Sequence, residues 1–117
     1  PRQRYRKDQY VIEGDFSSAG YFFAIAALTK STMTLKNLDP YSAQADRKFL
    51  SILEKMGNEI YMNDRSITII GKQILPLELD MEDCPDQVQT MAVLAAFAKG
   101  VTKISGVRSL RLKETER

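Results

Sequence analysis

One ten-residue stretch decides the fold: Tyr21-Phe22-Phe23-Ala24-Ile25-Ala26-Ala27-Leu28-Thr29-Lys30. It is apolar almost all round, and a helix with so little polar surface is buried on more than one side. We therefore predict a buried helix over residues 17–30. The next residues, 32–36, alternate in polarity and include β-branched side chains, so they are predicted to form a strand.

The same pattern returns further along the chain. Thr90-Met91-Ala92-Val93-Leu94-Ala95-Ala96-Phe97-Ala98-Lys99 aligns with the first stretch without a gap, at an offset of 69 residues (21 to 90). A fixed period is the mark of a repeat architecture. Hydrophobic periodicity predicts helices at 17–30, 46–56 and 86–99, and strands at 10–13, 32–36, 59–62, 66–70, 77–80 and 101–104.

These elements define an α+β (mixed α/β) fold class built from βαβαββ units. Residues 1–8 are predicted to be a basic flanking segment, residues 9–71 the first unit, and residues 72–117 a truncated second unit. Two nearly all-apolar helices cannot cover themselves in 117 residues. We therefore expect neighbouring units from a longer parent chain.

Composition excludes several kinds of chemistry. The sequence has no histidine, which removes Ser-His-Asp and Cys-His triads and every zinc site that uses histidine, so no metal is expected. Acid–base work would fall to carboxylates, Lys or Tyr. Cys84 is the single cysteine, so no intrachain disulfide can form, which suits a reducing cytosol. A net charge of +2 is too small to indicate nucleic acid, and no apolar run approaches a membrane span of about 20 residues.

The polar residues of interest all lie at predicted helix starts. Ser17 and Ser18 open the first helix, and Asp86, 69 residues after Ser17, opens its repeat partner. Lys113, Glu114 and Arg117 lie where the next helix is expected. Helix N-termini carry free N–H groups and the positive end of the helix dipole, so several of them in one cleft would bind an anionic substrate.

Each of these residues also has a purely structural interpretation. Ser17 and Ser18 are good N-cap residues, and Asp86 after Pro85 is a favourable first-turn carboxylate. The charged run 113–117 is typical of a solvated helix start. Tyr21 fits core packing, and Cys84 has no visible base and is expected to be an inert thiol.

Three segments carry a family resemblance. Residues 13–21, Glu-Gly-Asp-Phe-Ser-Ser-Ala-Gly-Tyr, resemble the Glu-Gly-Asp-Ala-Ser-Ser-Ala-Ser-Tyr segment of EPSP synthases, with Gly20 in place of a common Ser. Residues 80–86 resemble their Asp-Met-x-x-x-Pro-Asp. Residues 111–117, Arg-Leu-Lys-Glu-Thr-Glu-Arg, are similar to their Arg-Val-Lys-Glu-Thr-Asp-Arg. Order and separations match as well, so the chain resembles an interior fragment of an EPSP synthase.

The resemblance implies an inside-out α/β barrel type of fold. Each of two lobes would hold three βαβαββ units with the helices inside, and an interlobe crossover is expected near 38–45. It also implies transfer of the carboxyvinyl group of phosphoenolpyruvate to the 5-hydroxyl of shikimate 3-phosphate, giving EPSP and phosphate in aromatic amino acid biosynthesis. No cofactor is implied, and the location would be cytoplasmic. The partners would be the two substrates and the remainder of the parent chain, without which the fragment is expected to be inactive.

Roles follow residue by residue from the resemblance. Asp86 and Glu114 would be the catalytic carboxylates. The implied substrate-binding residues are Ser17, Ser18, Tyr21, Asp86, Ser109, Lys113 and Arg117. Of these, Arg117 would bind phosphoenolpyruvate and Lys113 would contact shikimate 3-phosphate. Ser109 matches a position that is often Asn in the family.

Three other functions remain open. The sister transferase that modifies UDP-N-acetylglucosamine shares the implied fold and chemistry, but the Lys-Glu-Thr-x-Arg pattern at 113–117 argues against it. A non-catalytic fragment with only a packing role is a second alternative. A nucleic-acid module is a weak third, because the net charge is small.

Overall fold

The computed structural model describes residues 2–4, 6 and 8–113. Its three α-helices are α1 (Phe16–Thr29), α2 (Lys48–Lys55) and α3 (Val88–Phe97). Its strands are β1 (Thr32–Lys36), β2 (Glu59–Asn63), β3 (Ser66–Ile70), β4 (Glu78–Asp80) and β5 (Lys103–Ser105). Short 3-10 helices precede α2 and α3 and follow β5: η1 (Ala45–Arg47), η2 (Pro85–Gln87) and η3 (Arg108–Leu112).

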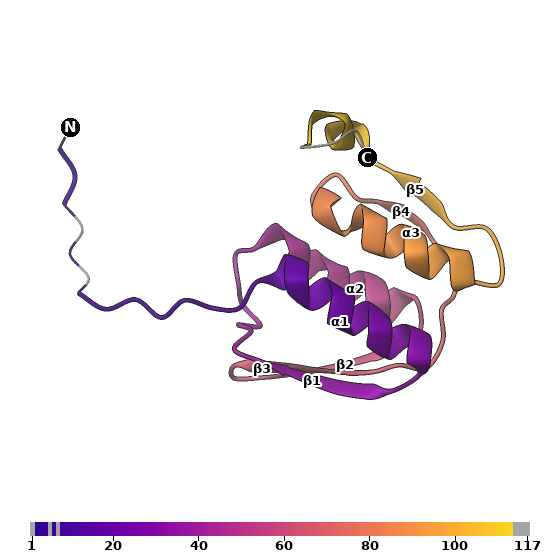
Figure 1. Cartoon of the computed structure of the whole chain (residues 1–117), viewed down its shortest axis with the longest axis horizontal. Helices are drawn as coiled ribbons and strands as arrows, with labels where there is room; N and C mark the ends of the chain where they lie inside the picture. The colour runs from indigo at the N-terminus through magenta and orange to yellow at the C-terminus, as the bar shows by residue number, and fades with distance from the viewer. Residues whose placement is uncertain (1, 5, 7, 114–117) are drawn as a thin grey trace.

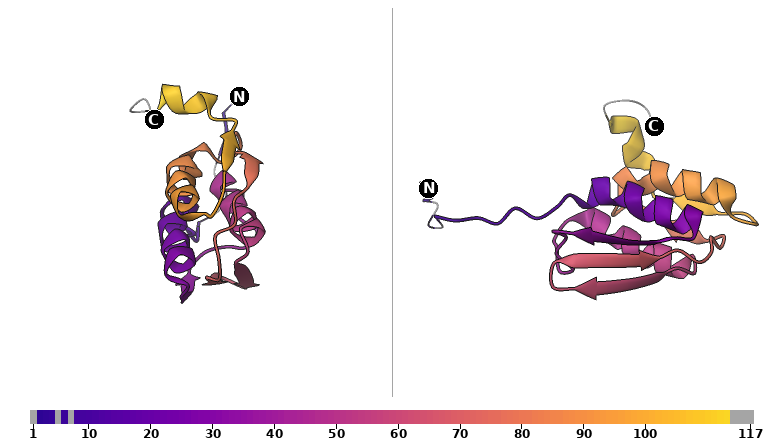
Figure 2. Two further views of the ribbon diagram at one scale, coloured as in Figure 1. Left: turned by 90° about the vertical axis from the view of Figure 1, so that its right-hand side faces the viewer. Right: turned by 60° about the horizontal axis from the view of Figure 1, so that its bottom comes forward.

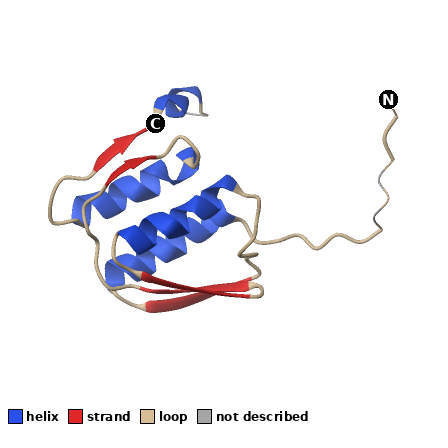
Figure 3. Ribbon diagram, turned by 180° about the vertical axis from the view of Figure 1, so that it is seen from behind, coloured by secondary structure: helices blue, strands red, loops and turns tan. Residues whose placement is uncertain are grey.

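The helices lie between two sheets (Figure 1). An antiparallel sheet of order β1-β3-β2 packs against α1 and α2. The parallel pair β4-β5 lies beside α3, on the far side from that sheet, as the turned views confirm (Figures 2 and 3). The mixed α+β fold class is thus confirmed, with helices inside and strands outside in the described chain.

A single hydrophobic cluster joins these layers. Helix α1 packs against both α3 and the antiparallel sheet, which is why the sequence makes it apolar on nearly every side. The largest fully buried apolar side chains are Phe16, Phe23, Phe49, Leu50, Leu53, Met56, Ile67, Ile69, Met81, Met91 and Leu94.

The contact between α1 and the antiparallel sheet is unusually close at Gly71, just after β3. A Cβ at Gly71 would lie 2.0 Å from the carbonyl oxygen of Ala26. The Gly71 N–H donates to the carbonyl of Ser31 at 2.9 Å, which fixes this approach. Only glycine lets the backbone after β3 pass the C-terminal half of α1 at this distance.

The strand predicted at 10–13 is wrong. The structure has no strand there; Tyr10, Val11 and Ile12 are 64%, 77% and 84% exposed on an extended arm (Figure 1). β1 pairs with β3 along one edge. The arm approaches the other edge of β1 only at Asn37, the residue after the strand, where Gly14 N–H donates a 2.6 Å hydrogen bond to Asn37 O. An apolar run without a paired neighbour gains no ladder hydrogen bonds and stays irregular.

The 69-residue repeat appears in the structure as the same order of elements occurring twice. Helix α1 is followed by β1, and α3 by β5, close to the predicted offset. The helices predicted at 46–56 and 86–99 each begin with a 3-10 turn, and α3 ends at Phe97 because Ala98 is extended. Residues 38–45, where an interlobe crossover is predicted, lead from β1 to η1 and α2, and the crossover stays a prediction. The domain boundaries stay a prediction.

Candidate functional site

Three helix starts meet at one end of the molecule. The start of α1 contacts both η1 and η2, and η1 contacts η2. Together they form a concavity of ≈ 330 Å³ lined by Ser17, Gln44, Ala45, Asp46, Pro85 and Asp86. Ser17 and Asp86, related by the repeat offset, therefore share one concavity.

Asp46 is a member of this site that the sequence did not reveal. It belongs to η1 and is only 7% exposed. Its Oδ2 accepts a hydrogen bond of 2.5 Å from the Ser17 hydroxyl, across 29 positions of sequence. A contact between such distant residues has no local sequence signal, so Asp46 reads as an ordinary first-turn carboxylate until the fold is known.

Asp86 forms an ion pair with Lys113, which follows η3. Lys113 Nζ lies 2.8 Å from Asp86 Oδ1, with the side chains 28% and 43% exposed. Such a pair places a carboxylate and an ammonium group side by side next to the concavity. Chemically, it offers a proton acceptor and a cation at the same edge.

Ser18 lies at the start of α1 as predicted, but its N–H is not available to an outside anion. Asp15 caps the helix: its carboxylate accepts from Ser17 N–H at 3.2 Å, Ser18 N–H at 2.9 Å and the Ser18 hydroxyl at 2.5 Å. These bonds, led by the one from the Ser18 hydroxyl, lower the pKa of Asp15. A phosphate at this helix start would have to displace Asp15.

The remaining predicted residues are not brought into the concavity. Tyr21 is 58% exposed and lines a separate apolar groove between α1 and α3, together with Ile25, Thr90 and Val93. Ser109 lies in η3, and its buried hydroxyl oxygen has no hydrogen-bond partner within the described part of the chain. Glu114 and Arg117 fall outside the described residues.

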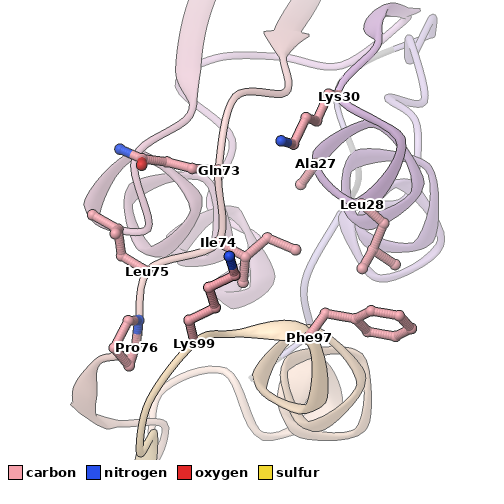
Figure 4. A pocket seen from close by; sticks show the side chains of 9 residues that line it. All are labelled: Ala27, Leu28, Lys30, Gln73, Ile74, Leu75, Pro76, Phe97 and Lys99. Carbon is pink, nitrogen blue, oxygen red and sulfur yellow. The ribbon is translucent and has the colours of Figure 1, made fainter.

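A second cavity, of ≈ 380 Å³, lies at the opposite ends of α1 and α3 (Figure 4). The repeat-related Lys30 and Lys99 line it together with Gln73. The rest of its lining is apolar and includes Phe97. Lysines at helix C-termini complement the helix dipole. None of the predicted site residues lines this cavity.

Cys84 has the environment of an inert thiol. It is 0% exposed, just before η2. Burial raises the pKa of its thiol above the ordinary value of 9.0. A thiol that stays protonated is a poor nucleophile, so Cys84 contributes to packing in the hydrophobic core.

Within the described residues, no group of three or more His, Cys, Asp or Glu side chains is arranged to hold a metal ion. Over that same part of the chain, none of the helices has the length and apolar character needed to cross a bilayer.

The fold and site together define a class: a repeated α/β protein whose helix starts converge on a polar concavity, with the Asp86–Lys113 ion pair beside it. Comparison with known sequences narrows this class. The family described as EPSP synthase (3-phosphoshikimate 1-carboxyvinyltransferase) matches residues 1–117. The chain belongs to the EPSP synthase family.

Individual relatives agree with the family match. The 3-phosphoshikimate 1-carboxyvinyltransferase of Colwellia psychrerythraea is 44% identical over 110 residues, which is 94% of this chain and 26% of the relative. That of Methanospirillum hungatei is 43% identical over 119 residues, 99% of this chain and 28% of the relative. That of Methanosphaera stadtmanae is 42% identical over 116 residues, which is 98% of this chain and 27% of the relative. The chain thus spans about a quarter of the length of these relatives.

Proposed function

We propose that this chain is part of an enzyme that transfers the carboxyvinyl group of phosphoenolpyruvate to the 5-hydroxyl of shikimate 3-phosphate, releasing phosphate. The observation that carries the proposal is the Asp86–Lys113 pair at the edge of a concavity made by three helix starts. The similarity to 3-phosphoshikimate 1-carboxyvinyltransferases supports the same reaction.

The reaction needs two proton transfers. The hydroxyl of shikimate 3-phosphate loses a proton as its oxygen attacks C2 of phosphoenolpyruvate, and the methylene carbon gains one. The tetrahedral intermediate then loses a proton from its new methyl group while the C2–O bond to phosphate breaks, so the double bond re-forms, phosphate leaves with a proton, and the 5-oxygen keeps its bond to C2. Carboxylates and a lysine can carry out this chemistry without histidine. We assign Asp86 to the 5-hydroxyl and Glu114 to the second acid–base role.

The substrate-binding assignments complete the proposal. Lys113 would neutralise charge on shikimate 3-phosphate while holding Asp86 in place, and Arg117 would bind phosphoenolpyruvate. The further contacts proposed for shikimate 3-phosphate are Ser17, Ser18, Tyr21 and Ser109. Because these residues supply only part of a site and the chain covers about a quarter of its relatives, we expect it to be inactive alone. The lone cysteine and this reaction fit a cytoplasmic protein.

A segment-swap chimaera tests the function. The matching part of the Colwellia relative is replaced by this chain, and phosphate release is measured with both substrates. Release that needs both phosphoenolpyruvate and shikimate 3-phosphate supports the proposal. A folded chimaera without such release, beside an active parent relative, refutes it. If that chimaera does not fold, the same replacement is made in the Methanospirillum relative and phosphate release is measured in the same way.

Substitutions in the chimaera separate catalytic from structural roles. Asp86→Ala should lower kcat at least about 100-fold, with only a moderate loss of shikimate 3-phosphate binding, because a positioned acid–base group acts mainly in the transition state. Asp83→Ala, which removes an exposed carboxylate paired with Lys48, is the matched control and should leave kcat unchanged. Near-normal kcat in Asp86→Ala leaves Asp86 only its role at the helix start.

A further inference from the structure

The buried side chain of Gln87 connects all three helix starts. Gln87 follows Asp86 in η2 and is 1% exposed. Its Nε2 lies 3.4 Å from Phe16 O and 3.2 Å from Ser17 O, both in the first turn of α1. The same nitrogen lies 3.4 Å from Asp46 Oδ2 in η1. One amide group therefore contacts elements 41 to 71 residues away.

Gly20 makes room for this side chain. A Cβ at Gly20 would lie 2.2 Å from Gln87 Oε1, 2.7 Å from Nε2 and 2.8 Å from Cδ. Glycine inside a helix is unfavourable relative to alanine, and here it is needed for space rather than for a left-handed conformation. Gly20 and Gln87 thus form a matched pair in which the missing side chain of one admits the other.

The chemistry of Gln87 indicates a directional role. Its Oε1 is buried without a hydrogen-bond partner among the described residues. Leaving a buried acceptor unpaired is destabilising, and an apolar side chain of similar length would fill the same space without that penalty. The amide is therefore useful for where its N–H groups point, which is toward Ser17 O and Asp46.

We propose that Gln87 is a positioning residue that fixes η2 against the starts of α1 and η1 and so holds Asp86 beside Ser17 and Asp46. Its catalytic consequence rests on the function proposed above. The geometric part is independent of that function, because it concerns only how three helix starts are joined.

A set of variants of this chain tests the geometry. Gln87→Met keeps the length of the side chain and removes its donors. Gln73→Met, on the exposed loop that lines the far cavity, is the matched control. We expect the ¹⁵N order parameters of the Ser17 and Asp86 amides to fall in Gln87→Met from about 0.85, typical of rigid backbone, toward about 0.6. They should not change in Gln73→Met.

Urea unfolding tests the matched pair. Gly20→Ala and Gln87→Ala should each lower the urea midpoint. The double variant Gly20→Ala/Gln87→Ala should have a higher midpoint than Gly20→Ala alone, because the new methyl group enters the space that Gln87 leaves. A double variant no more stable than Gly20→Ala would overturn the pairing. Order parameters in Gln87→Met equal to those of the unsubstituted chain would overturn the positioning role.

The chimaera then links position to catalysis. Gln87→Met should reduce kcat about 10- to 100-fold with a smaller change in KM for shikimate 3-phosphate, because a misplaced group costs mainly the reacting step. Unchanged kcat refutes the catalytic consequence. An inactive unsubstituted chimaera counts against the proposed function alone, since the order parameters decide the geometry without any substrate.

Discussion

The N-terminal cap of α1 gives a prediction that can be worked out from the structure. Asp15 accepts bonds from the N–H groups of Ser17 and Ser18, two of the donors that a helix start leaves unsatisfied. Replacing such a cap by alanine costs about 1 kcal/mol. Because α1 contributes Phe16 and Phe23 to the core, loosening its first turn affects the whole unfolding transition.

We therefore expect Asp15→Ala to lower the unfolding free energy by about 1 kcal/mol. With a denaturant slope of about 2 kcal/mol per molar urea, the midpoint should move down by about 0.5 M. Circular dichroism during urea unfolding measures this midpoint. Asp8→Ala, on the exposed arm, is the control and should not move the midpoint.

The pH dependence separates the charge of Asp15 from its hydrogen bonds. Since folding lowers the pKa of Asp15 below 3.8, its stabilising effect is complete above that value and is lost as the pH falls through the lower, folded pKa. Asp15→Asn keeps an acceptor but cannot titrate. The stability advantage of the unsubstituted chain over Asp15→Asn should therefore shrink below about pH 4. An Asp15→Ala midpoint within about 0.1 M of the unsubstituted chain, or a pH-independent difference from Asp15→Asn, would refute the capping argument.

Three further outcomes follow from other contacts. Gly71→Ala should lower the unfolding free energy by about 1–3 kcal/mol, measured in urea, because its methyl group would overlap the carbonyl of Ala26; an unchanged midpoint would contradict this close approach. Cys84 should react slowly with a thiol reagent at pH 8 and quickly in urea, because burial raises its pKa; equal rates would mean that the thiol is accessible. Lys113→Ala should cost less than about 1 kcal/mol of stability, since its pair with Asp86 is partly exposed; thermal unfolding showing a larger loss would make the pair mainly structural.

Local patterns predicted most of the fold. The all-apolar runs form α1 and α3, and the strands predicted at 59–62 and 66–70 form the β2–β3 hairpin. The strand predicted at 10–13 failed because its sequence is strand-like while its pairing depends on a neighbour that periodicity cannot supply. Hydrophobic periodicity also does not distinguish a 3-10 turn from the first turn of an α-helix, so η1 and η2 fall within the longer helices predicted at 46–56 and 86–99.

The sequence predicted only those residues of the candidate site that the repeat marks as helix starts. Ser17 and Asp86 were found through the repeat, and the structure places both in one concavity. Asp15 does carry a local signal, because an Asp before a Ser-Ser helix start is a favoured N-cap. Asp46 and Gln87 carried none, because their roles arise from contacts across tens of residues.

The small parallel sheet has a consequence for how the polypeptide behaves at high concentration. β4 and β5 pair only with each other among the described residues, so each has one open backbone edge. Open edges template the addition of further strands, and proteins blunt them with charge. Here Glu78, Asp80 and Lys103 are exposed, and Lys103 bonds Glu78 at 2.7 Å. We expect these charges to act as gatekeepers against fibre growth, so that neutralising them leaves the core intact and makes the six-residue sheet a seed for aggregation.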